Sequence, residues 1–401
     1  MMLPSTPMPL LHASDRRIFR ANPAYTVVPF DRLSARDRAT IADFTRDPEF
    51  FGILRPHADA AGTIKAVSRS VALLVYALQS PGTIPRQAVA GGDESIVDAV
   101  WRLTLDGVLE VERDGVFVSG ADALAEGTAA ESRGAVGRLS REALRLVACI
   151  EGEDALVLSD RLYHYNRRPL TPRWVDRIRT PGDALRFAGA SANSHTAAAL
   201  SRHWKTKAAG TGRYWLAWWP RVKSRNPRRS DDAMVTYKVY VSPTTETLPD
   251  VFPAVINVLV DAGAPMFKLG GTASAVLRPD KLVLYFARRD AAEDVAATLL
   301  TKLHGTPAHP VPFSHDMGGD GLISLGIDPP SERAMIAQVG ASWRLWLCRR
   351  LASYVSTAQR AGRAHDAERF ALERVALDGV DPSTWEPSED AVRGFAGGAP
   401  A

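Results

Sequence analysis

The sequence contains little cysteine and no long apolar run. Cys149 and Cys348 are the only cysteines among 401 residues, and neither belongs to a CxxC pair or a Cys/His cluster. We therefore expect neither a disulfide framework nor a structural zinc site, which favours a reducing, cytoplasmic location. A membrane-spanning helix needs about 20 consecutive apolar residues, and no such run occurs. Since the N-terminus also lacks the basic start of a secretory signal, we expect no membrane partner.

The common motifs of nucleotide binding, hydrolysis and metal catalysis are missing as well. There is no GxGxxG, Walker, GxSxG or HExxH pattern, and the nine histidines are scattered without metal-ligand spacing. Asp316 and Asp320, on either side of two glycines, resemble a calcium loop only faintly. The sequence therefore predicts no bound metal and no organic cofactor.

The net charge is small, but the positive charge is concentrated. The formal charge is +4 at pH 7, with 46% apolar and 23% charged residues, which is typical of a globular protein of two or three domains. Residues 219–229 and 343–350 are densely basic. These segments fit either a solvated loop and helix face or a surface for phosphate or an acidic peptide.

Residues 1–122 are predicted to form a winged-helix-like domain. Helices are expected over 64–78, 83–88 and 95–107. An Asp-Gly connection at 114–115 then joins two alternating apolar segments, as in a β-hairpin. Three helices followed by a hairpin is the element order of a winged helix.

The third predicted helix does not suit a DNA major groove. Arg102 is its only basic residue and Asp98 and Asp106 accompany it, whereas base readers place several Arg, Lys, Asn or Gln side chains on one face. We therefore expect no nucleic-acid partner, and a winged-helix regulator is the least favoured interpretation. The exposed wing strand suits capture of an extended peptide by strand addition. A domain that only packs against the rest of the chain is the alternative.

Residues 136–401 are predicted to form a second, lyase-like α+β domain with its core at 213–360. A polar linker over 121–135 precedes it, and a mainly helical segment opens it. Short strands then alternate with helices, which predicts a mixed or antiparallel α+β layer. Strands are expected at 236–241, 265–269, 282–287 and 322–325, helices at 248–259, 291–303 and 331–356, and a loose tail beyond Asp381.

Lys268 carries the most specific chemical signal. It follows Phe267 on an apolar strand, where burial disfavours the ammonium and lowers the lysine pKa. A neutral amine can remove a weakly acidic α-proton. If the β-carbon of the substrate carries a phosphate ester, loss of that proton expels phosphate and leaves an alkene. The alternative is a strand-end lysine whose amine reaches solvent.

Such a β-elimination also needs cations around the phosphate and a donor for the departing oxygen. Arginine suits phosphate because its planar guanidinium can donate two hydrogen bonds. The candidate phosphate-binding residues are Arg278, Arg344, Arg349, Lys205, Lys207, Arg213 and Lys238.

Several short motifs in the second domain resemble one family. Residues 238–242 read Lys-Val-Tyr-Val-Ser, Phe267-Lys268 follows the next predicted helix, and Arg278 precedes Leu284-Tyr285. A Gly-x-Ser-aromatic helix start with downstream arginine follows at Gly340, Ser342, Trp343 and Arg349. On these motifs the segment 237–330 resembles the phosphothreonine lyases among bacterial type III effectors. It is also similar to the HopA-like effectors and to the class V-like lyase components of lanthipeptide synthetases.

The resemblance implies that Lys268 is the catalytic base. The family has a histidine as general acid where this chain has Tyr240. A tyrosine, with a reference pKa of about 10, is a weaker acid than imidazolium. The resemblance therefore leaves Tyr240, His315, Tyr285 and Lys238 as candidates for assisting the leaving group. Loss of elimination activity with retained phosphopeptide binding is the other outcome that it allows.

The function implied is a lyase that converts phosphoserine and phosphothreonine of a ribosomally made precursor peptide to dehydroalanine and dehydrobutyrine. It would act on the product of a separate Ser/Thr kinase, alone or in complex with that kinase. The winged-helix-like domain would hold the leader peptide, which raises the local substrate concentration to about millimolar for a short linker. The rival function is a non-catalytic phosphopeptide- or partner-binding module of the HopA-like effector type.

Overall fold

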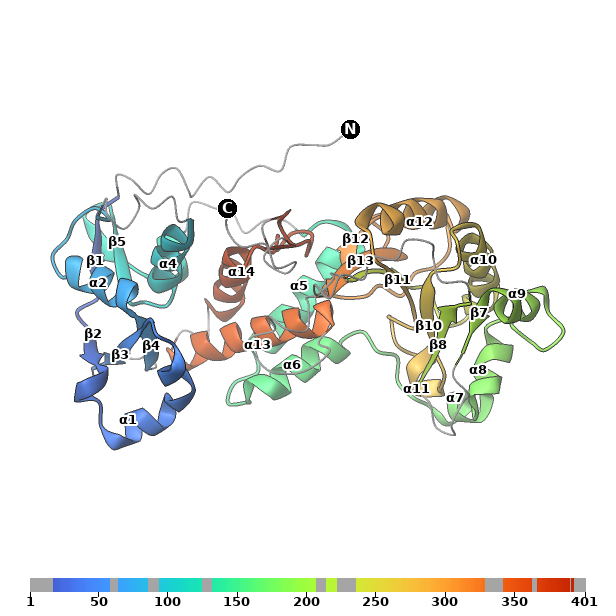
Figure 1. Ribbon diagram of the computed structural model, residues 1–401, viewed down its shortest axis with the longest axis horizontal. Coiled ribbons are helices and arrows are strands. Elements are labelled where there is room, and N and C mark those ends of the chain that lie inside the picture. The colour runs from blue at the N-terminus through green and yellow to red at the C-terminus, as the bar shows by residue number, and fades with distance from the viewer. Residues whose placement is uncertain are drawn as a thin grey trace. The chain divides into compact units, whose positions relative to one another are not determined.

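The computed structural model divides the chain into two compact units (Figure 1). Unit 1 comprises Met1–Ala129 and Ser353–Asp378, and unit 2 comprises Ala130–Ala352 and Gly379–Ala401. The structure describes residues 17–57, 64–85, 94–124, 132–206, 214–221, 236–328, 342–362, 366–389 and 391–392. The helix α13 (Trp343–Arg360) contributes to both units, since the boundary falls at Ser353.

Unit 1 contains two three-stranded antiparallel sheets and short helices. The first sheet has the order β1-β5-β6, from β1 (Phe19–Ala21), β5 (Leu109–Arg113) and β6 (Val116–Val118). The second has the order β2-β3-β4, from β2 (Tyr25–Pro29), β3 (Phe50–Pro56) and β4 (Lys65–Ser68). The helices are α1 (Ala35–Thr40), α2 (Arg69–Ala77), α4 (Glu94–Leu105) and α14 (Ala367–Leu377), with 3-10 turns η2 (Phe30–Arg32), η3 (Ala42–Arg46) and η4 (Gly120–Leu124).

The predicted hairpin is confirmed in unit 1. Asp114 and Gly115 have φ angles of 49° and 79°, the positive values that a tight two-residue turn between twisted strands requires. The predicted helix over 64–78 is wrong at its start, because residues 65–68 form β4 and pair with β3. The helix begins only after Ser68, whose side chain accepts a hydrogen bond from the Val71 N–H.

The winged-helix interpretation itself is not confirmed. Of the predicted second helix, residues 83–85 are not helical and the remainder lies outside the described residues. A second sheet, β2-β3-β4, also lies between β1 and α2 in the chain, and the predicted pattern did not include it. What the structure supports is a mixed helix and antiparallel-sheet architecture.

Unit 2 is built on one seven-stranded sheet in which every neighbouring pair is antiparallel. Its order is β12-β13-β9-β11-β10-β8-β7, which confirms the predicted antiparallel α+β layer. The strands are β7 (Trp204–Lys205), β8 (Trp215–Pro220), β9 (Thr236–Val241), β10 (Met266–Gly270), β11 (Leu282–Phe286), β12 (His315–Asp316) and β13 (Ile323–Asp328).

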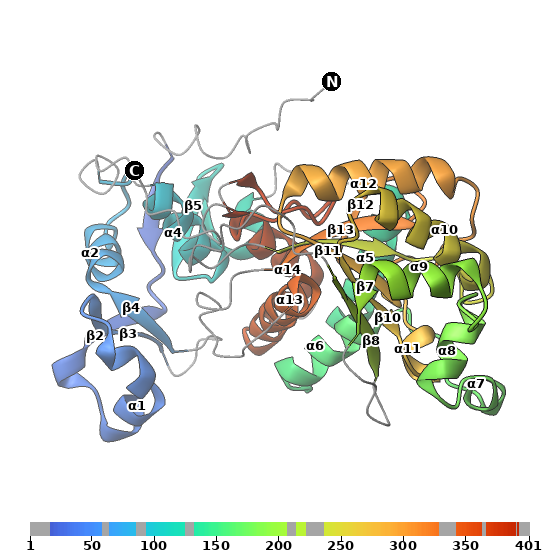
Figure 2. The ribbon, with the colours of Figure 1, turned by 45° about the vertical axis from the view of Figure 1, so that its right-hand side comes forward.

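Helices cover one face of this sheet, as Figure 2 shows for α9, α10 and α12. Their bounds are α9 (His195–His203), α10 (Leu248–Asp261) and α12 (Arg289–Lys302). The other helices of unit 2 are α5 (Gly134–Ala148), α6 (Ala155–His164), α7 (Pro172–Arg177), α8 (Pro181–Phe187) and α11 (Ala273–Val276). None of the described helices combines the length and apolar character that crossing a bilayer requires.

The expected loose tail beyond Asp381 is wrong for the described residues. Val380 and Pro387 form an isolated β-bridge, and Trp385 between them is fully buried. The Trp385 ring makes an edge-on contact with Phe313, at 5.2 Å between ring centroids. One large aromatic side chain therefore attaches a polar, glycine-rich tail to unit 2.

We expect Trp385→Ala to lower the free energy of unfolding by about 3–5 kcal/mol, because it removes a fully buried aromatic ring. Urea unfolding followed by circular dichroism measures the change. Leu156→Ala, at a position that is 69% exposed, is the matched control and should change the midpoint little. Equal midpoints for the two variants would contradict a packed tail.

Candidate functional site

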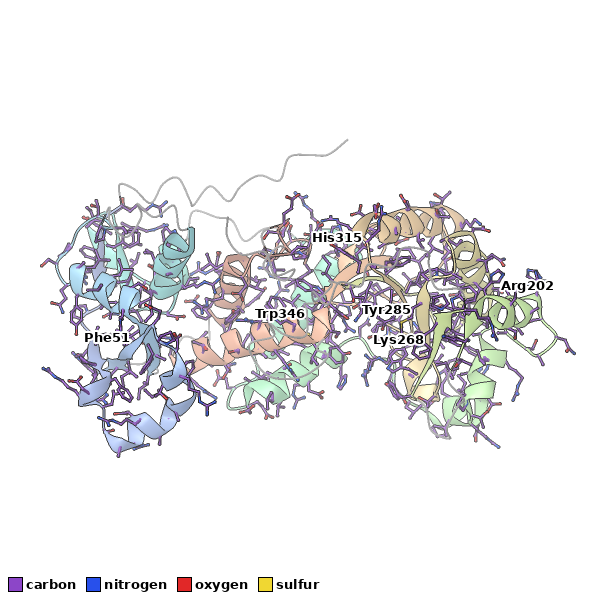
Figure 3. The ribbon with its side chains drawn as sticks, viewed as in Figure 1. Phe51, Arg202, Lys268, Tyr285, His315 and Trp346 are labelled. Carbon is purple, nitrogen blue, oxygen red and sulfur yellow. The ribbon has the colours of Figure 1, made fainter. Side chains whose placement is uncertain are left out.

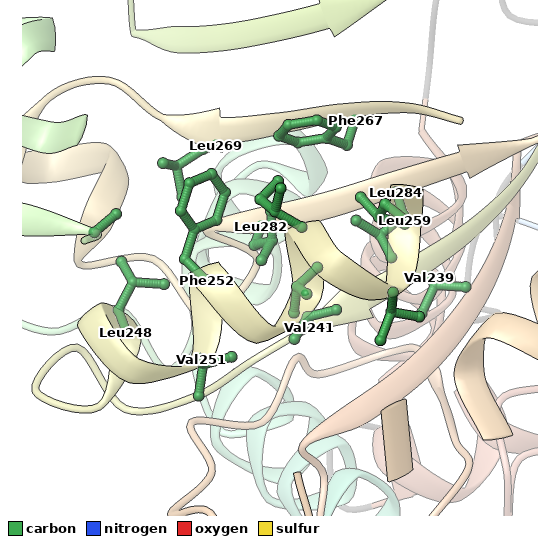
Figure 4. Close-up of a cluster of buried hydrophobic side chains, with 14 of the residues drawn as sticks. Val239, Val241, Leu248, Val251, Phe252, Leu259, Phe267, Leu269, Leu282 and Leu284 are labelled. Atoms are coloured by element: carbon green, nitrogen blue, oxygen red, sulfur yellow. The ribbon is translucent and has the colours of Figure 1, made fainter. Parts of the chain in front are cut away.

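The two faces of β10 have opposite character. Phe267 and Leu269 are fully buried against α10, in the core that Figure 4 displays with Phe252 and Leu284. Because successive side chains of a strand alternate between faces, Lys268 between them points to the face away from α10. Packing of the apolar neighbours thus fixes the direction of the lysine.

The antiparallel register brings polar side chains from neighbouring strands onto the face of Lys268. Lys268 aligns with Val283 on β11, which aligns with Tyr240 on β9. In the next row Tyr285 aligns with Lys238. Figure 3 shows Lys268 and Tyr285 close to each other. The face therefore carries two lysines and two tyrosines from three adjacent strands.

Lys268 is half-buried and packs against aromatic rings. Its Nζ lies 4.3 Å from the centroid of the Trp215 ring and 5.7 Å from that of Tyr285. Burial, followed by the positive charge of Lys238, lowers the pKa of Lys268 from 10.5 to about 8. An appreciable fraction of the amine is therefore neutral near physiological pH, as a base requires.

Lys238 is buried and paired. Its Nζ forms an ion pair with Asp328 and lies 5.2 Å from the Tyr285 ring centroid. The other oxygen of Asp328 accepts a hydrogen bond from the backbone N–H of Trp343 at 2.9 Å, at the first residue of α13. Asp328 thus connects the lysine of β9 to the start of a helix far away in the sequence.

Arg278 and Arg344 meet at a buried carboxylate, that of Asp280. Arg278 donates from Nε at 2.6 Å and from Nη2 at 2.8 Å to its two oxygens, and Arg344 donates from Nη1 at 3.0 Å. Burial alone would raise the pKa of Asp280, but Arg344 and Arg278 lower it far below its ordinary value. The carboxylate stays ionised and compensates part of the positive charge.

Tyrosines and backbone carbonyls complete this arginine cluster. Arg278 also donates to the hydroxyls of Tyr163 at 3.2 Å and Tyr214 at 3.4 Å. Arg344 donates from Nε to the carbonyl of Pro312 at 2.9 Å and from Nη2 to that of Tyr163 at 3.0 Å. The orientation of both guanidinium groups is therefore set before any ligand arrives.

Arg167 adds a further cation close to Arg278. It is half-buried, and burial, followed by the charge of Arg278, lowers its pKa. Among the described residues no carboxylate forms an ion pair with it. Its neighbour Arg168, by contrast, is exposed and pairs with Glu246 at 2.6 Å.

The charges of the site do not balance. Among the described residues, five cations gather here, those of Lys238, Lys268, Arg167, Arg278 and Arg344, and the carboxylates that pair with them are those of Asp280 and Asp328. The named groups therefore carry a net charge of about +3 with Lys268 protonated and +2 with it neutral. Unpaired charge in a partly buried site is costly, so an anionic ligand would be favoured.

Tyr240 and His315, two of the predicted proton donors, lie on different faces of the sheet. Tyr240 is 3% exposed, and burial, followed by Asp328, raises its pKa well above its ordinary value. His315 aligns with Leu325, which aligns with Val239 of the helix-covered core. His315 thus projects from the face opposite to Lys268. Tyr285 lies beside Lys268, and burial raises its pKa strongly as well.

Of the remaining predicted phosphate ligands, the structure describes Lys205 and Arg349. Lys205 lies exposed on the edge strand β7. Arg349 follows Arg344 on α13 by five residues, which turns it about 140° around the helix. Lys207 and Arg213 lie outside the described residues, as does Gly340 of the predicted helix start.

Sequence reasoning missed Asp280, Tyr163, Tyr214 and Arg167. The Arg-x-Asp spacing of Arg278 and Asp280 was a usable signal for a buried ion pair. Tyr163 and Arg167 come from one segment and Tyr214 from another, and no local pattern connects either segment to Lys268.

Comparison with known proteins adds little. No protein-family model and no curated protein matches the sequence. Among solved structures, an effector protein from Pseudomonas syringae pv. tomato strain DC3000 is similar with a TM-score of 0.37 and 12% identity, over 63% of this chain and 98% of that one. One from Pseudomonas syringae pv. syringae strain 61 gives 0.36 and 14% over the same shares. Likeness this weak supports no conclusion about fold or function, so the family resemblance stays a prediction.

We expect Asp280→Ala to destabilise the protein by about 3–5 kcal/mol, because it leaves two buried guanidinium groups without their shared carboxylate. The shift in the denaturant midpoint measures it. Asp290→Ala removes an exposed partner of Arg288 and should change the midpoint little, because solvent screens such a pair. A similar, small effect of both substitutions would argue against a buried ionic cluster.

Proposed function

We propose that this protein is a lyase that eliminates phosphate from phosphoserine or phosphothreonine in a peptide. One observation carries the proposal, namely the excess of positive charge around a half-buried lysine whose pKa is lowered to about 8. A phosphate monoester brings close to two negative charges at neutral pH, which matches that excess. The same site supplies both an anion clamp and a base.

The reaction would proceed by transfer of the substrate α-proton to the neutral amine of Lys268. The electrons of the C–H bond form the new C=C bond, and the β-carbon–oxygen bond breaks. Its electron pair leaves with the phosphate, whose bridging oxygen takes up a proton. Lys268, now an ammonium, returns its proton to solvent, so atoms and charges balance without a redox partner.

The cations act on the phosphate before and during bond cleavage. Arg167, which has no carboxylate of its own among the described residues, is available to bind the dianion directly. Arg278 and Arg344 already share Asp280 and contribute positive potential together with their remaining N–H groups. Neutralisation of the phosphate by these groups also limits the rise that a nearby dianion would cause in the Lys268 pKa.

Lys238 is the proton donor that the arrangement favours. Its ammonium and that of Lys268 both lie within 6 Å of the Tyr285 ring, at 5.2 Å and 5.7 Å. Lys238 forms an ion pair with Asp328, whereas Tyr240 and Tyr285 have raised pKa values. Tyr285 would act through a neutral hydroxyl as a hydrogen-bond donor.

A separate Ser/Thr kinase would phosphorylate the peptide first. The specific reaction that we propose is the lanthipeptide-type conversion of its phosphorylated residues to dehydroamino acids. Unit 1 would hold a leader segment of that peptide. In the described part of its first sheet, β6 pairs only with β5, and Val116 at its start is 62% exposed. An extended peptide can add to such an edge as a further strand.

A non-catalytic phosphopeptide-binding module is the second candidate. The observation in its favour is that the general-acid position holds a buried tyrosine, Tyr240, with a raised pKa. Incubation with a synthetic phosphoserine peptide distinguishes the two functions. A lyase yields a peptide lighter by phosphoric acid in the mass spectrum, and a module binds the peptide unchanged.

We expect kcat/KM to rise about tenfold per pH unit below pH 8 and to level off above it, because the base must lose its proton. Lys268→Arg keeps the cation but cannot act as a base, so phosphopeptide binding should persist while turnover falls by about 10²–10⁴-fold. Phosphate release assayed from pH 6 to 9 measures the profile. Retained turnover in Lys268→Arg would exclude Lys268 as the base.

We expect Arg167→Gln to raise the Kd for a phosphopeptide by about 10–100-fold, because it removes a charged hydrogen bond to phosphate. Arg168→Gln is the matched control, since Arg168 is exposed and pairs with Glu246. Isothermal titration with phosphorylated and unphosphorylated peptide measures the effect. An equal loss for both variants would assign it to overall charge rather than to a phosphate contact.

A further inference from the structure

Lys281 is a buried ionisable residue that the proposed reaction does not use. It directly precedes β11, and its side chain is 0% exposed. Its Nζ donates to the carbonyl of Pro243 at 2.8 Å and lies 3.3 Å from Nδ1 of His309. Among the described residues no carboxylate forms an ion pair with it. The contacts with Pro243 and His309 therefore hold the amine in place, since a buried polar group needs hydrogen-bond partners.

The contacts of His309 determine which ring nitrogen carries its proton. Nε2 lies 2.6 Å from the carbonyl oxygen of Asn166. A carbonyl can only accept, so Nε2 carries the proton, and Nδ1 of the neutral ring accepts from Lys281. Burial, followed by the charge of Lys281, lowers the pKa of His309 to about 4, so the ring is neutral at pH 7.

The hydrogen bonds of Lys281 do not depend on its charge. Burial lowers the pKa of Lys281 to about 7, so both forms of the amine are populated near neutral pH. The neutral amine keeps two N–H groups, one for Pro243 and one for His309. The connection from Lys281 through His309 to the backbone of Asn166 is thus available in either form.

Asn166 lies in a tight turn that leads from the end of α6 to Arg167. Its φ of 62° is a left-handed conformation, which asparagine adopts more readily than most residues. Its side-chain amide donates to the carbonyl of Pro310 at 2.8 Å, while its own carbonyl accepts from His309. Two consecutive residues therefore hold both the backbone and the side chain of Asn166.

The turn is attached a second time just after Arg167. The backbone N–H of Arg168 donates to the carbonyl of Leu277 at 3.2 Å. Leu277 and Lys281 are four residues apart, and the arginine and carboxylate of the candidate site lie between them. One short segment therefore holds the turn on both sides of Arg167, directly at Leu277 and indirectly through Lys281.

These attachments oppose the repulsion that acts on the Arg167 side chain. Arg167 is half-buried, and the positive charge of Arg278 lowers its pKa, so the two guanidinium groups repel each other. A free turn would relieve this repulsion by releasing Arg167 toward solvent. A turn that is fixed before and after Arg167 keeps both cations at the same place before an anion arrives.

We propose that Lys281 and His309 are positioning residues, which hold Arg167 beside Arg278 so that both guanidinium groups bind one phosphate. Neither Lys281 nor His309 contacts the substrate, because both act through the turn at Asn166. The inference rests on the proposed function for its ligand, the phosphate of a phosphopeptide. Its geometry rests on the contacts of the turn alone.

The test is binding of a peptide in which phosphonomethylalanine replaces phosphoserine, measured by isothermal titration with the full-length protein. The carbon–phosphorus bond of this peptide cannot be eliminated, so the titration reports binding alone. His309→Leu removes both hydrogen bonds of the ring, and we expect the Kd to rise about tenfold, with no change for the serine peptide. His309→Gln, whose amide can donate to Asn166 and accept from Lys281, should restore most of the affinity.

A double-mutant cycle distinguishes positioning from a general loss of stability. In the Arg167→Gln background, His309→Leu should weaken binding of the phosphonate peptide no further, because the side chain that it positions is gone. Leu299→Ala is the control, since it removes a fully buried side chain of α12 on the other face of the sheet. It should lower the thermal midpoint and leave the Kd unchanged.

Two results would overturn the positioning role. One is an unchanged Kd in folded His309→Leu, and the other is a loss that simply adds to that of Arg167→Gln. Thermal melts verify folding. If His309→Leu does not fold, Lys281→Met removes the donor to His309 within a side chain of similar length, and the same cycle with Arg167→Gln decides.

Failure of the lyase proposal gives a different result. The phosphoserine peptide then shows no loss of phosphoric acid in the mass spectrum, while the phosphonate peptide still binds and the His309→Leu cycle still decides the positioning role. Equal Kd values of the wild-type protein for the phosphonate and serine peptides would overturn the positioning role whatever the turnover, because no phosphate group would then be bound at Arg167.

Discussion

The buried carboxylate of Asp280 is the group on which the candidate site depends. It accepts three hydrogen bonds from Arg278 and Arg344, two arginines that are 5% and 1% exposed. Neither guanidinium could remain in that place without a counter-charge, because an unpaired buried ion costs several kcal/mol. Since Arg278 follows α11 and Arg344 belongs to α13, one carboxylate fixes two segments that are distant in sequence.

Asp328 plays the corresponding part at the other end of the site. Through Lys238 and the backbone N–H of Trp343 it connects β9 with the start of α13. The two aspartates together hold that helix start against the sheet, yet they do not balance the five cations around them. The positive charge that these two carboxylates leave uncompensated includes that of Lys268 and Arg167. The proposed phosphate binding rests on this imbalance, whereas the proposed elimination needs in addition that Lys268 be neutral when the substrate arrives.

Much of the second unit could be predicted from the sequence. Residues 236–241 form β9 as expected, and β10, β11, α10 and α12 begin within two residues of their predicted starts. These elements have strong apolar periodicity, which depends on neighbours within a few residues. The prediction failed where distant contacts decide the structure. Residues 65–68 lie in a helix-like pattern but pair with β3 as a strand. The tail beyond Asp381 has a composition that predicts disorder, but its Trp385 side chain is fully buried.

The sequence by itself determined that Lys268 lies on a strand between two apolar residues, and hence that it points away from the core that buries them. It also supplied the motif that includes Lys238 and Tyr240 on one strand. Only the tertiary structure decided which groups face that lysine. Tyr163 and Arg167 come from one segment, and Tyr214 and Asp280 come from two others. The physical reason is that strand alternation is local, whereas a charged site depends on distance and burial, which are set when strands pair and helices pack.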